Sequence, residues 1–184
     1  MVRRGAVFDL PTQGETFEIL ETPEETGDRY VARATFAPHA RGPSAHRHPG
    51  LEERFEVVSG KMELRVGRQR RELTAGQTAV VSPGVVHDLW NPTDEPAVMV
   101  GEIVFTPLGL RPEADVLEML ETAAGLARDG KINPRTHAPK NLLQAAVIAY
   151  AFREGFAFPM SIRLQRAVLR PLAALGRFRG FQST

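Results

Sequence analysis

Four side chains able to bind one metal ion lie in two short blocks of this sequence: His46, His48, Glu53 and His87. His46 and His48 are two residues apart, so in an extended segment their imidazoles leave the backbone on the same side. Glu53 adds an anionic oxygen, and the turn-forming residues 82–84 return a strand that carries His87 toward the other three. Three neutral nitrogens and one carboxylate suit a divalent first-row metal and leave coordination positions open. The pattern therefore predicts a metal site.

The alternative interpretation is that these histidines are ordinary surface or core residues. A lone histidine favours that interpretation, but two spaced blocks that supply complementary ligands favour metal binding. His39 and His137 have no ligand partner at a useful spacing and are expected to be ordinary polar residues. Glu53 is preferred to its neighbour Glu52 because it shares strand parity with the apolar Phe55.

The two blocks resemble the sequence motifs of the cupin superfamily, G(x)5HxH(x)3-4E(x)6G and G(x)5PxG(x)2H(x)3N. The stretch from His46 to Gly60 fits the first motif, although Gly42 lies closer to His46 than the motif asks. The second block departs once, at Ser82, and otherwise keeps the family spacing at Gly84, His87 and Asn91. The resemblance implies a mainly β, double-stranded β-helix (a jelly-roll barrel) that holds one divalent transition metal.

The first part of the chain has the pattern of strands. Short alternating stretches at 30–36, 61–67 and 97–105 are separated by turns rich in Gly, Pro and Asp, which is typical of an antiparallel barrel or sandwich. We therefore expect residues 1–106 to form the cupin β-barrel domain, with a motif-bearing core at about 30–106.

The pattern becomes helical in the rest of the chain, 107–184, which we expect to form an α-helical C-terminal extension. Asn141 and Ser161 are suited to cap the second and third helices, and Pro171 should kink the third. The three expected helices span 112–130, 142–154 and 162–178.

The second of these helices is apolar around most of its circumference, so the barrel, a partner chain or both must cover it. A homodimer is the commonest closed solution and is the expected assembly. From residue 155 onward the chain carries five arginines and no acid, which would also suit an anionic membrane surface. We favour the simpler interpretation, a helix that covers the barrel or a dimer partner with its arginines in solvent.

Composition excludes several other functions. The 184 residues suffice for one domain with an appendage, and the lack of cysteine excludes a disulfide framework, a thiolate zinc site and a nucleophilic Cys. The N-terminal apolar run is too short for a signal peptide, and no run approaches the roughly 20 apolar residues of a membrane span. A cytoplasmic protein is therefore expected. The net charge of +1, without a basic patch among aromatics, argues against a nucleic-acid partner.

A mostly apolar pocket is expected beside the metal. Its walls should be the residues that share strand parity with the ligands: Phe55, Val57, Met62, Leu64, Val66 and Leu89. Glu102 and Tyr30 are the predicted catalytic residues among the few polar candidates. Glu102 interrupts an apolar strand, where a buried carboxyl could transfer a proton or orient a ligand histidine. The alternative is that Glu102 faces solvent, because the sequence does not fix the inward parity of its strand.

These features favour a metal-dependent enzyme that acts on a small apolar or aromatic molecule, with a non-haem oxygenase as the first expectation. The cupin resemblance also implies isomerases, cyclases and lyases of small-molecule pathways as the alternative. A non-catalytic small-molecule-binding cupin and a storage protein with a vestigial metal site are further alternatives. Iron is the expected metal, although manganese, nickel, zinc, copper and cobalt accept the same ligands.

Overall fold

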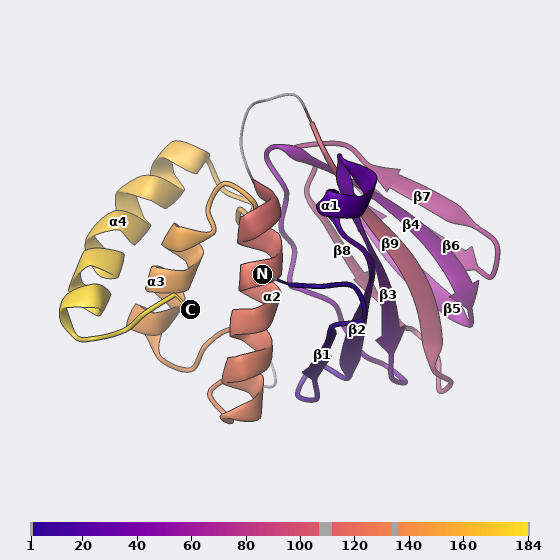
Figure 1. Ribbon diagram of the computed structural model, residues 1–184, viewed down its shortest axis with the longest axis horizontal. Coiled ribbons are helices and arrows are strands. Elements are labelled where there is room, and N and C mark those ends of the chain that lie inside the picture. The colour runs from indigo at the N-terminus through magenta and orange to yellow at the C-terminus, as the bar shows by residue number, and fades with distance from the viewer. Residues whose placement is uncertain (1, 107–111, 134–135, 184) are drawn as a thin grey trace.

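The protein has a strand-rich part and a helical part, which lie side by side in the computed structural model (Figure 1). The structure describes residues 2–106, 112–133 and 136–183. Its strands lie within residues 7–105, and its long helices lie within residues 112–178. Helix α2 (Pro112–Arg128) lies between the strands and the last two helices (Figure 1). No described helix is long and apolar enough to cross a membrane.

The described strands form two antiparallel sheets, one with the order β1-β2-β3-β9-β4-β7 and the other with the order β6-β5-β8. A short helix, α1 (Pro23–Thr26), connects β2 to β3. The strand bounds are β1 (Val7–Leu10), β2 (Glu15–Glu21), β3 (Arg29–Phe36), β4 (Leu51–Ser59), β5 (Lys61–Val66), β6 (Gln69–Thr74), β7 (Thr78–Val81), β8 (His87–Trp90) and β9 (Ala97–Phe105). The two sheets and the helices that follow them confirm the expected fold class.

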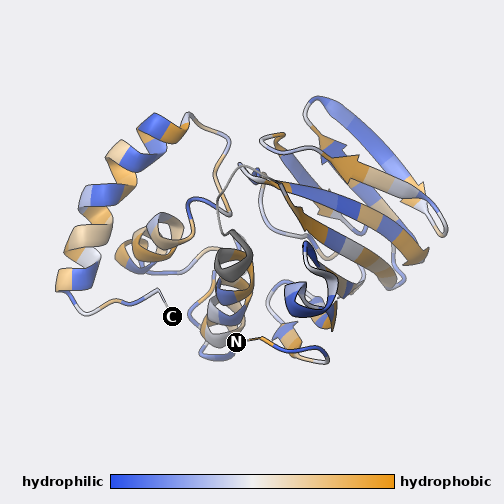
Figure 2. Ribbon diagram, turned by 45° about the horizontal axis from the view of Figure 1, so that its top comes forward, coloured by the Kyte–Doolittle hydropathy of each residue, from blue (hydrophilic) through white to orange (hydrophobic). Residues whose placement is uncertain are grey.

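The barrel core is built from the alternation of apolar and polar residues along the strands, visible as orange and blue segments in Figure 2. The residues predicted to face inward belong to one packed cluster: Phe55, Val57, Met62, Leu64 and Leu89 are buried, and Val66 packs against them partly buried. Glycine is required at Gly60, between β4 and β5, where φ is 75° and a Cβ atom would lie 2.7 Å from the Pro96 carbonyl oxygen.

Helix α2 covers the end of the larger sheet that β1 and β2 form. Leu117 of α2 packs into a buried cluster with Phe8, Ile19 and Tyr30. Further along the same helix, Ala127 packs against Leu10. The first part of the helical extension is therefore part of the barrel's hydrophobic packing.

The last two helices, α3 (Leu142–Ala151) and α4 (Ile162–Phe178), pack against each other. The Asn141 side chain accepts hydrogen bonds from the Leu143 and Gln144 amides, and Ser161 accepts one from Leu164, so both predicted caps are present. Helix α3 ends earlier than the sequence pattern indicated, and α4 continues through Pro171.

Helix α4 meets α3 through small residues rather than through its leucines. At Gly176 a Cβ atom would lie 2.6 Å from the Val147 side chain, so only glycine permits this close approach. Ala173 and Gln165 are also buried and Leu169 is partly buried, whereas most of the larger apolar side chains of α4 are exposed, among them Ile162, Leu164, Val168, Leu172 and Leu175. One chain alone thus leaves most of the large apolar side chains of α4 uncovered.

Candidate metal centre and the adjoining cavity

The four candidate ligands come from three segments that the barrel brings together. His46 lies opposite His87 in an isolated antiparallel bridge, with His46 N to His87 O at 3.0 Å and His87 N to His46 O at 2.8 Å. Glu53 lies on β4 and shares a face with its register partners Val81 and Ile103. His48 follows His46 by two residues, as the predicted same-side arrangement requires.

The ligand atoms of these four side chains converge on one point. They all lie within 4.8 Å of one another, and all four residues are buried. His48 Nε2 lies 3.1 Å from His46 Nε2 and 3.4 Å from Glu53 Oε1, and His87 Nε2 lies 2.7 Å from Glu53 Oε2. Ligands about 2.1 Å from one ion, at angles of roughly 90° to 110°, are separated by about 3.0 to 3.4 Å. The two separations from His48 Nε2, 3.1 and 3.4 Å, are those of ligands that share one cation.

Backbone carbonyls fix the orientation of each imidazole. His46 Nδ1 donates to the Ser44 carbonyl at 2.9 Å, His87 Nδ1 donates to the Val85 carbonyl at 3.1 Å, and His48 Nδ1 donates to the Gly155 carbonyl. A carbonyl oxygen can only accept, so Nδ1 carries the hydrogen in each of these contacts. In a neutral ring the Nε2 lone pair is then free for a metal, and the hydrogen bond holds the ring in place.

Two of the candidate ligand atoms make no hydrogen bond with the protein. Glu53 Oε2 and His87 Nε2 are fully buried and, although they lie close together, the geometry between them is not that of a hydrogen bond. Unsatisfied polar atoms are costly in a protein interior. A divalent cation bound by all four residues would satisfy both atoms, so this donor set fits a metal ion.

The electrostatics of the cluster favour an ionised carboxylate among imidazoles. Burial, together with the neighbouring His48 and His87, lowers the pKa of His46 to about 3. Burial also opposes charge on His48, but the Glu53 carboxylate outweighs it and raises the pKa of His48. Burial likewise opposes the charge of Glu53, yet His48 and His87 hold the pKa of Glu53 well below its usual range. A buried anionic oxygen is thus available for a cation.

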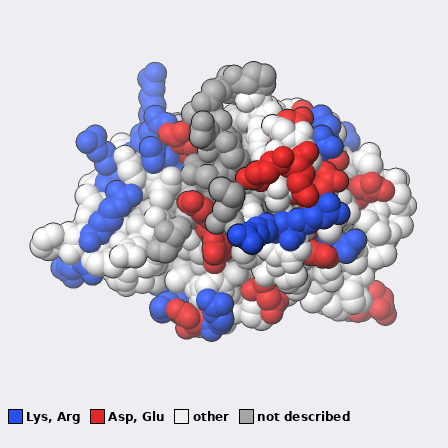
Figure 3. Space-filling model, in the orientation of Figure 1, with Lys and Arg blue, Asp and Glu red and all other residues white. Residues whose placement is uncertain are grey.

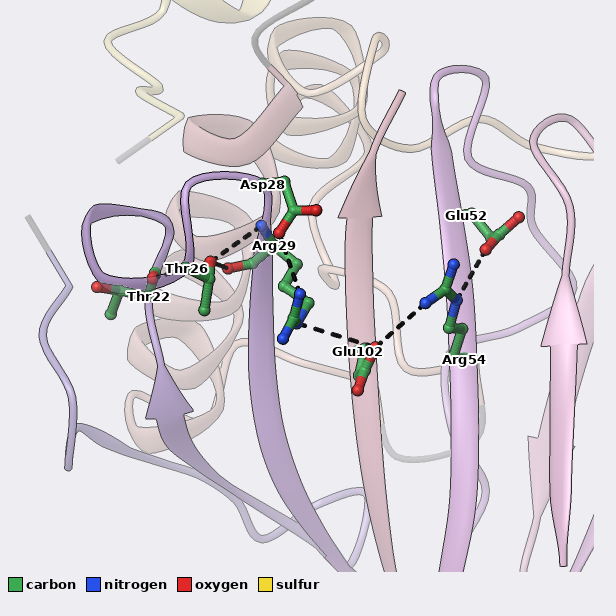
Figure 4. Close-up of polar contacts among 7 residues, drawn as sticks. All are labelled: Thr22, Thr26, Asp28, Arg29, Glu52, Arg54 and Glu102. Atoms are coloured by element: carbon green, nitrogen blue, oxygen red, sulfur yellow. Dashed lines mark hydrogen bonds and ion pairs between the residues drawn. The ribbon is translucent and has the colours of Figure 1, made fainter. Parts of the chain in front are cut away.

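Glu102 does not join this cluster and lies on the outer face of the larger sheet, which corrects the prediction that it lies beside the metal. In the register of β4 and β9, Glu102 is opposite Arg54, so it faces away from the side to which Glu53 points. Its carboxylate contacts Arg54 at 3.7 Å and Arg29 at 4.0 Å, and Arg54 also binds Glu52 at 2.8 Å (Figure 4). Glu102 and Glu52 therefore belong to a surface row of ion pairs.

Tyr30 shares the inner face of the sheet but lies away from the ligands. It is opposite Ile103, which separates it from Glu53 across the sheet. Its ring packs in the cluster that Leu117 of α2 covers, edge-on to Phe105 with 5.6 Å between ring centroids. The structure does not bring Tyr30 to the candidate metal centre.

The connection between α3 and α4 closes one side of the metal centre, which the sequence did not indicate. The Phe156 ring stacks on His46, with 4.5 Å between centroids and 12° between the ring planes. Arg47 and Ala157 exchange two backbone hydrogen bonds of 2.9 Å, and Gly155 supplies the carbonyl that holds His48. The helical extension thus contributes directly to the surroundings of the candidate ligands.

A cavity of about 220 Å³ lies on the other side of Phe156, between the barrel and helices α2 and α3. Its walls are mainly apolar and include Leu10, Phe17, Phe152 and Ile148. None of the four candidate ligands lines it. The predicted apolar pocket therefore has different walls from those expected, because the predicted wall residues pack together as the barrel core.

Glu15 is a residue of this cavity that we did not predict. It lies on β2 and is only 2% exposed, and burial raises its pKa to about 8. The alternation of Glu15, Phe17 and Ile19 was a usable signal, because the two apolar residues place Glu15 on the inner face of its strand.

We expect Glu15 to make the protein less stable as the pH rises. Its pKa is about 8 in the folded chain and about 4.5 when exposed, so between these values the folded state binds more protons. The free energy of unfolding then falls with rising pH, by at most about 5 kcal/mol in total, because one pKa unit corresponds to about 1.4 kcal/mol. Glu15→Gln keeps the shape of the neutral acid and cannot ionise. Urea unfolding at several pH values should show the variant gaining stability over the wild type up to about pH 9. A constant difference between the two proteins would contradict the assignment.

Comparisons with known proteins agree with this architecture. Residues 32–105 match the family model of the cupin domain. Similar solved structures include a predicted oxalate decarboxylase from Thermotoga maritima, with 17% identity, a TM-score of 0.50 and coverage of 58% of this chain and 99% of that chain. An RmlC-like cupin from Shewanella frigidimarina has 21% identity and a TM-score of 0.49, covering 57% and 87% of the two chains.

The cupin domain of an XRE family transcriptional regulator from Enterobacter cloacae has 22% identity and a TM-score of 0.47, covering 51% of this chain and 99% of that one. No curated protein matches the chain. The identities to these structures bear on the fold alone. The family match, however, spans the segment that carries His46, His48, Glu53 and His87 within the two-sheet barrel. Residues 32–105 of this chain therefore form a cupin domain.

Proposed function

We propose that this protein is a metal-dependent enzyme that acts on a small, mainly apolar organic molecule, and that the reaction is an oxygenation. The observation that carries the proposal is the buried cluster of three oriented histidines and one ionised carboxylate. A bound divalent metal would supply Lewis-acid or redox chemistry at positions that the four ligands leave open. Iron is the metal we propose first, because such a ligand set suits a redox-active first-row ion.

The surroundings of the cluster support an apolar substrate. The described residues that line the adjoining cavity include no Lys or Arg, so the cavity offers no fixed cation for a phosphate or a dicarboxylate. Phe156 excludes water from one side of the cluster by stacking on His46. Backbone carbonyls thus orient the candidate ligands, and Phe156 keeps water away from one side of them.

A second candidate reaction is a proton transfer, as in an isomerase, cyclase or lyase. The observation in its favour is Glu15, a buried carboxyl whose raised pKa of about 8 suits a general acid or base near neutral pH. This candidate needs no dioxygen. It does need a substrate long enough to reach from the metal centre past Phe156 to the cavity.

The two reactions can be separated by measuring oxygen consumption. Purified protein would be loaded with Fe(II) under argon and screened against acetylacetone and monocyclic aromatic compounds, with an oxygen electrode and product analysis in parallel. We expect substrate-dependent oxygen uptake that is lost in His87→Ala. Product formation at an equal rate without oxygen would contradict oxygenation and favour proton transfer. Binding of these compounds without any turnover would favour a non-catalytic cupin.

We further propose that the protein forms a homodimer through α4. This helix exposes Leu164, Val168, Leu172 and Leu175, an apolar surface that a second copy could cover. Light scattering during size-exclusion chromatography should give about twice the chain mass of 20.3 kDa, and Leu172→Glu should give the monomer mass. A monomeric wild type would contradict the dimer.

A monomer would also favour the membrane alternative, in which the arginines of the helical part meet anionic lipid. Figure 3 shows mainly basic side chains over the helical side of one face, whereas acidic and basic side chains are mixed over the strands. Sedimentation with anionic liposomes at varied salt would test that alternative.

A further inference from the structure

Glu15 is a buried carboxyl without a hydrogen-bond partner among the residues that the structure describes. In the sheet register it lies opposite Leu10 on one side and Phe36 on the other, both buried, so its side chain shares the inner face with core residues. Both carboxyl oxygens, Oε1 and Oε2, are fully buried and neither makes a hydrogen bond. A buried polar group without a hydrogen bond lowers stability, so packing alone gives no reason for a carboxyl here.

The cavity that Glu15 lines has room for a small molecule. An apolar cavity of about 150 Å³ can hold benzene, so about 220 Å³ can hold one ring with a short substituent. The walls come from the barrel and from both α2 and α3, with Phe17, Met119 and Phe152 among the larger apolar side chains. Such a shape, mostly apolar with one polar group, is typical of sites that orient a ligand by a single hydrogen bond.

We propose that this cavity binds a small apolar molecule of about one ring that carries a carbonyl or hydroxyl oxygen, and that Glu15 donates a hydrogen bond to this oxygen. The inference does not depend on the proposed oxygenation, because none of the four candidate metal ligands lines the cavity. The proposed ligand would lie next to Phe156, whose ring lines the cavity and also stacks on His46.

The protonation state of Glu15 decides which ligand chemistry fits. Burial raises the pKa of Glu15 to about 8, so near neutral pH the carboxyl is mostly protonated and its O–H can donate. Among the described residues that line the cavity, His137 is the other titratable group, and no Lys or Arg is present to ionise the acid. A neutral carboxyl favours an oxygen acceptor over an ammonium group, which would require the ionised form.

The test uses two probes of similar size, acetophenone and cumene, in which the carbonyl oxygen of the first takes the place of a methyl group and a hydrogen of the second. Ligand-observed NMR titration of the full-length protein at about pH 6.5 should show acetophenone binding several-fold more tightly than cumene, as one hydrogen bond predicts. In Glu15→Leu the two probes should bind equally. In Glu15→Gln, which keeps an N–H donor, the preference should remain.

Two further measurements separate this site from general apolar binding. In the wild type the acetophenone preference should disappear as the pH rises through about 8, whereas in Glu15→Gln it should not change with pH. Ala149→Leu places extra atoms in the cavity without touching Glu15 and should abolish binding of both probes. This variant keeps the test decisive if Glu15→Leu does not fold.

Several outcomes would overturn the proposal. Failure of wild-type protein to bind either probe, or full binding by Ala149→Leu, would exclude the cavity as a site. An unchanged acetophenone preference in Glu15→Leu would exclude Glu15 as the hydrogen-bond donor. Tighter binding of benzylamine than of acetophenone would show that the site takes a cation instead of a neutral oxygen compound.

Discussion

Replacing His87 by alanine is expected to strip the metal from the protein and abolish turnover while the barrel stays folded. His87 Nε2 is one of the ligand atoms that converge in the cluster, and its loss leaves two nitrogens and a carboxylate. Loss of a direct ligand should weaken metal affinity by more than about 100-fold, the upper end of what outer-shell substitutions cause. Elemental analysis after loading and desalting would give the metal content, and circular dichroism would show whether the fold remains.

Glu53 and Glu52 provide a matched pair for the same experiment. Glu53 points to the histidines, whereas Glu52 binds Arg54 on the outer face of the same strand. We expect Glu53→Gln to lose the metal and Glu52→Gln to retain it, although the substitutions are chemically identical and adjacent. Equal metal loss in both variants, or full metal content in His87→Ala, would reject the ligand assignment.

Ending the chain after Thr106 is expected to give an aggregating or poorly folded barrel. This truncation removes Leu117, which covers the buried cluster of Phe8, Ile19 and Tyr30. It also removes Phe156, which stacks on His46. Exposing such surfaces costs about 25 cal/mol for each Å² of apolar area and leaves an apolar surface that promotes aggregation. Soluble yield and size-exclusion chromatography would measure the effect.

Point variants separate loss of packing from loss of chain length. Leu117→Asp puts a charge into the buried interface of α2 and should reproduce the folding defect, whereas Leu142→Asp at the exposed start of α3 should not. We propose on this basis that residues 107–184 are not an independent domain. A well-behaved truncated monomer that still binds metal would show that they are a separate appendage.

The ligand cluster and the barrel could be predicted because both depend on local spacing. His46 and His48 are two positions apart, which fixes their common side, and strand alternation distinguishes Glu53 from Glu52 without knowledge of the fold. The apolar alternation also identified Phe55, Val57 and Leu64 as core residues. These features require only that the segments be extended and that one face be buried.

The position of Glu102 could not be predicted because it depends on register between distant strands. β9 pairs with β4 across a register shift between Val57 and Ser59, and that irregularity is not visible in the sequence pattern. The pairing of β9 with β4, which lies about 45 residues earlier in the chain, decides which parity of β9 faces the metal. In the observed register Ile103 rather than Glu102 lies opposite Glu53.

The surroundings of the cluster were not predictable for a related reason. Phe156 and Gly155 lie more than 60 residues from His87 in the sequence, in a loop whose docking depends on the packing of α3 and α4. The partner of the exposed leucines of α4 could not be predicted either, because the amphipathic pattern identifies an apolar face but not which surface covers it.

The most direct test of the metal centre is a crystal structure of the metal-loaded protein with anomalous diffraction data collected above and below the absorption edge of the metal. We expect one anomalous peak inside the barrel, about 2.0 to 2.3 Å from the Nε2 atoms of His46, His48 and His87 and from a Glu53 oxygen. The rings should keep their Nδ1 hydrogen bonds to Ser44, Gly155 and Val85. An anomalous peak elsewhere, or a fully loaded crystal with no peak among these four residues, would contradict this expectation.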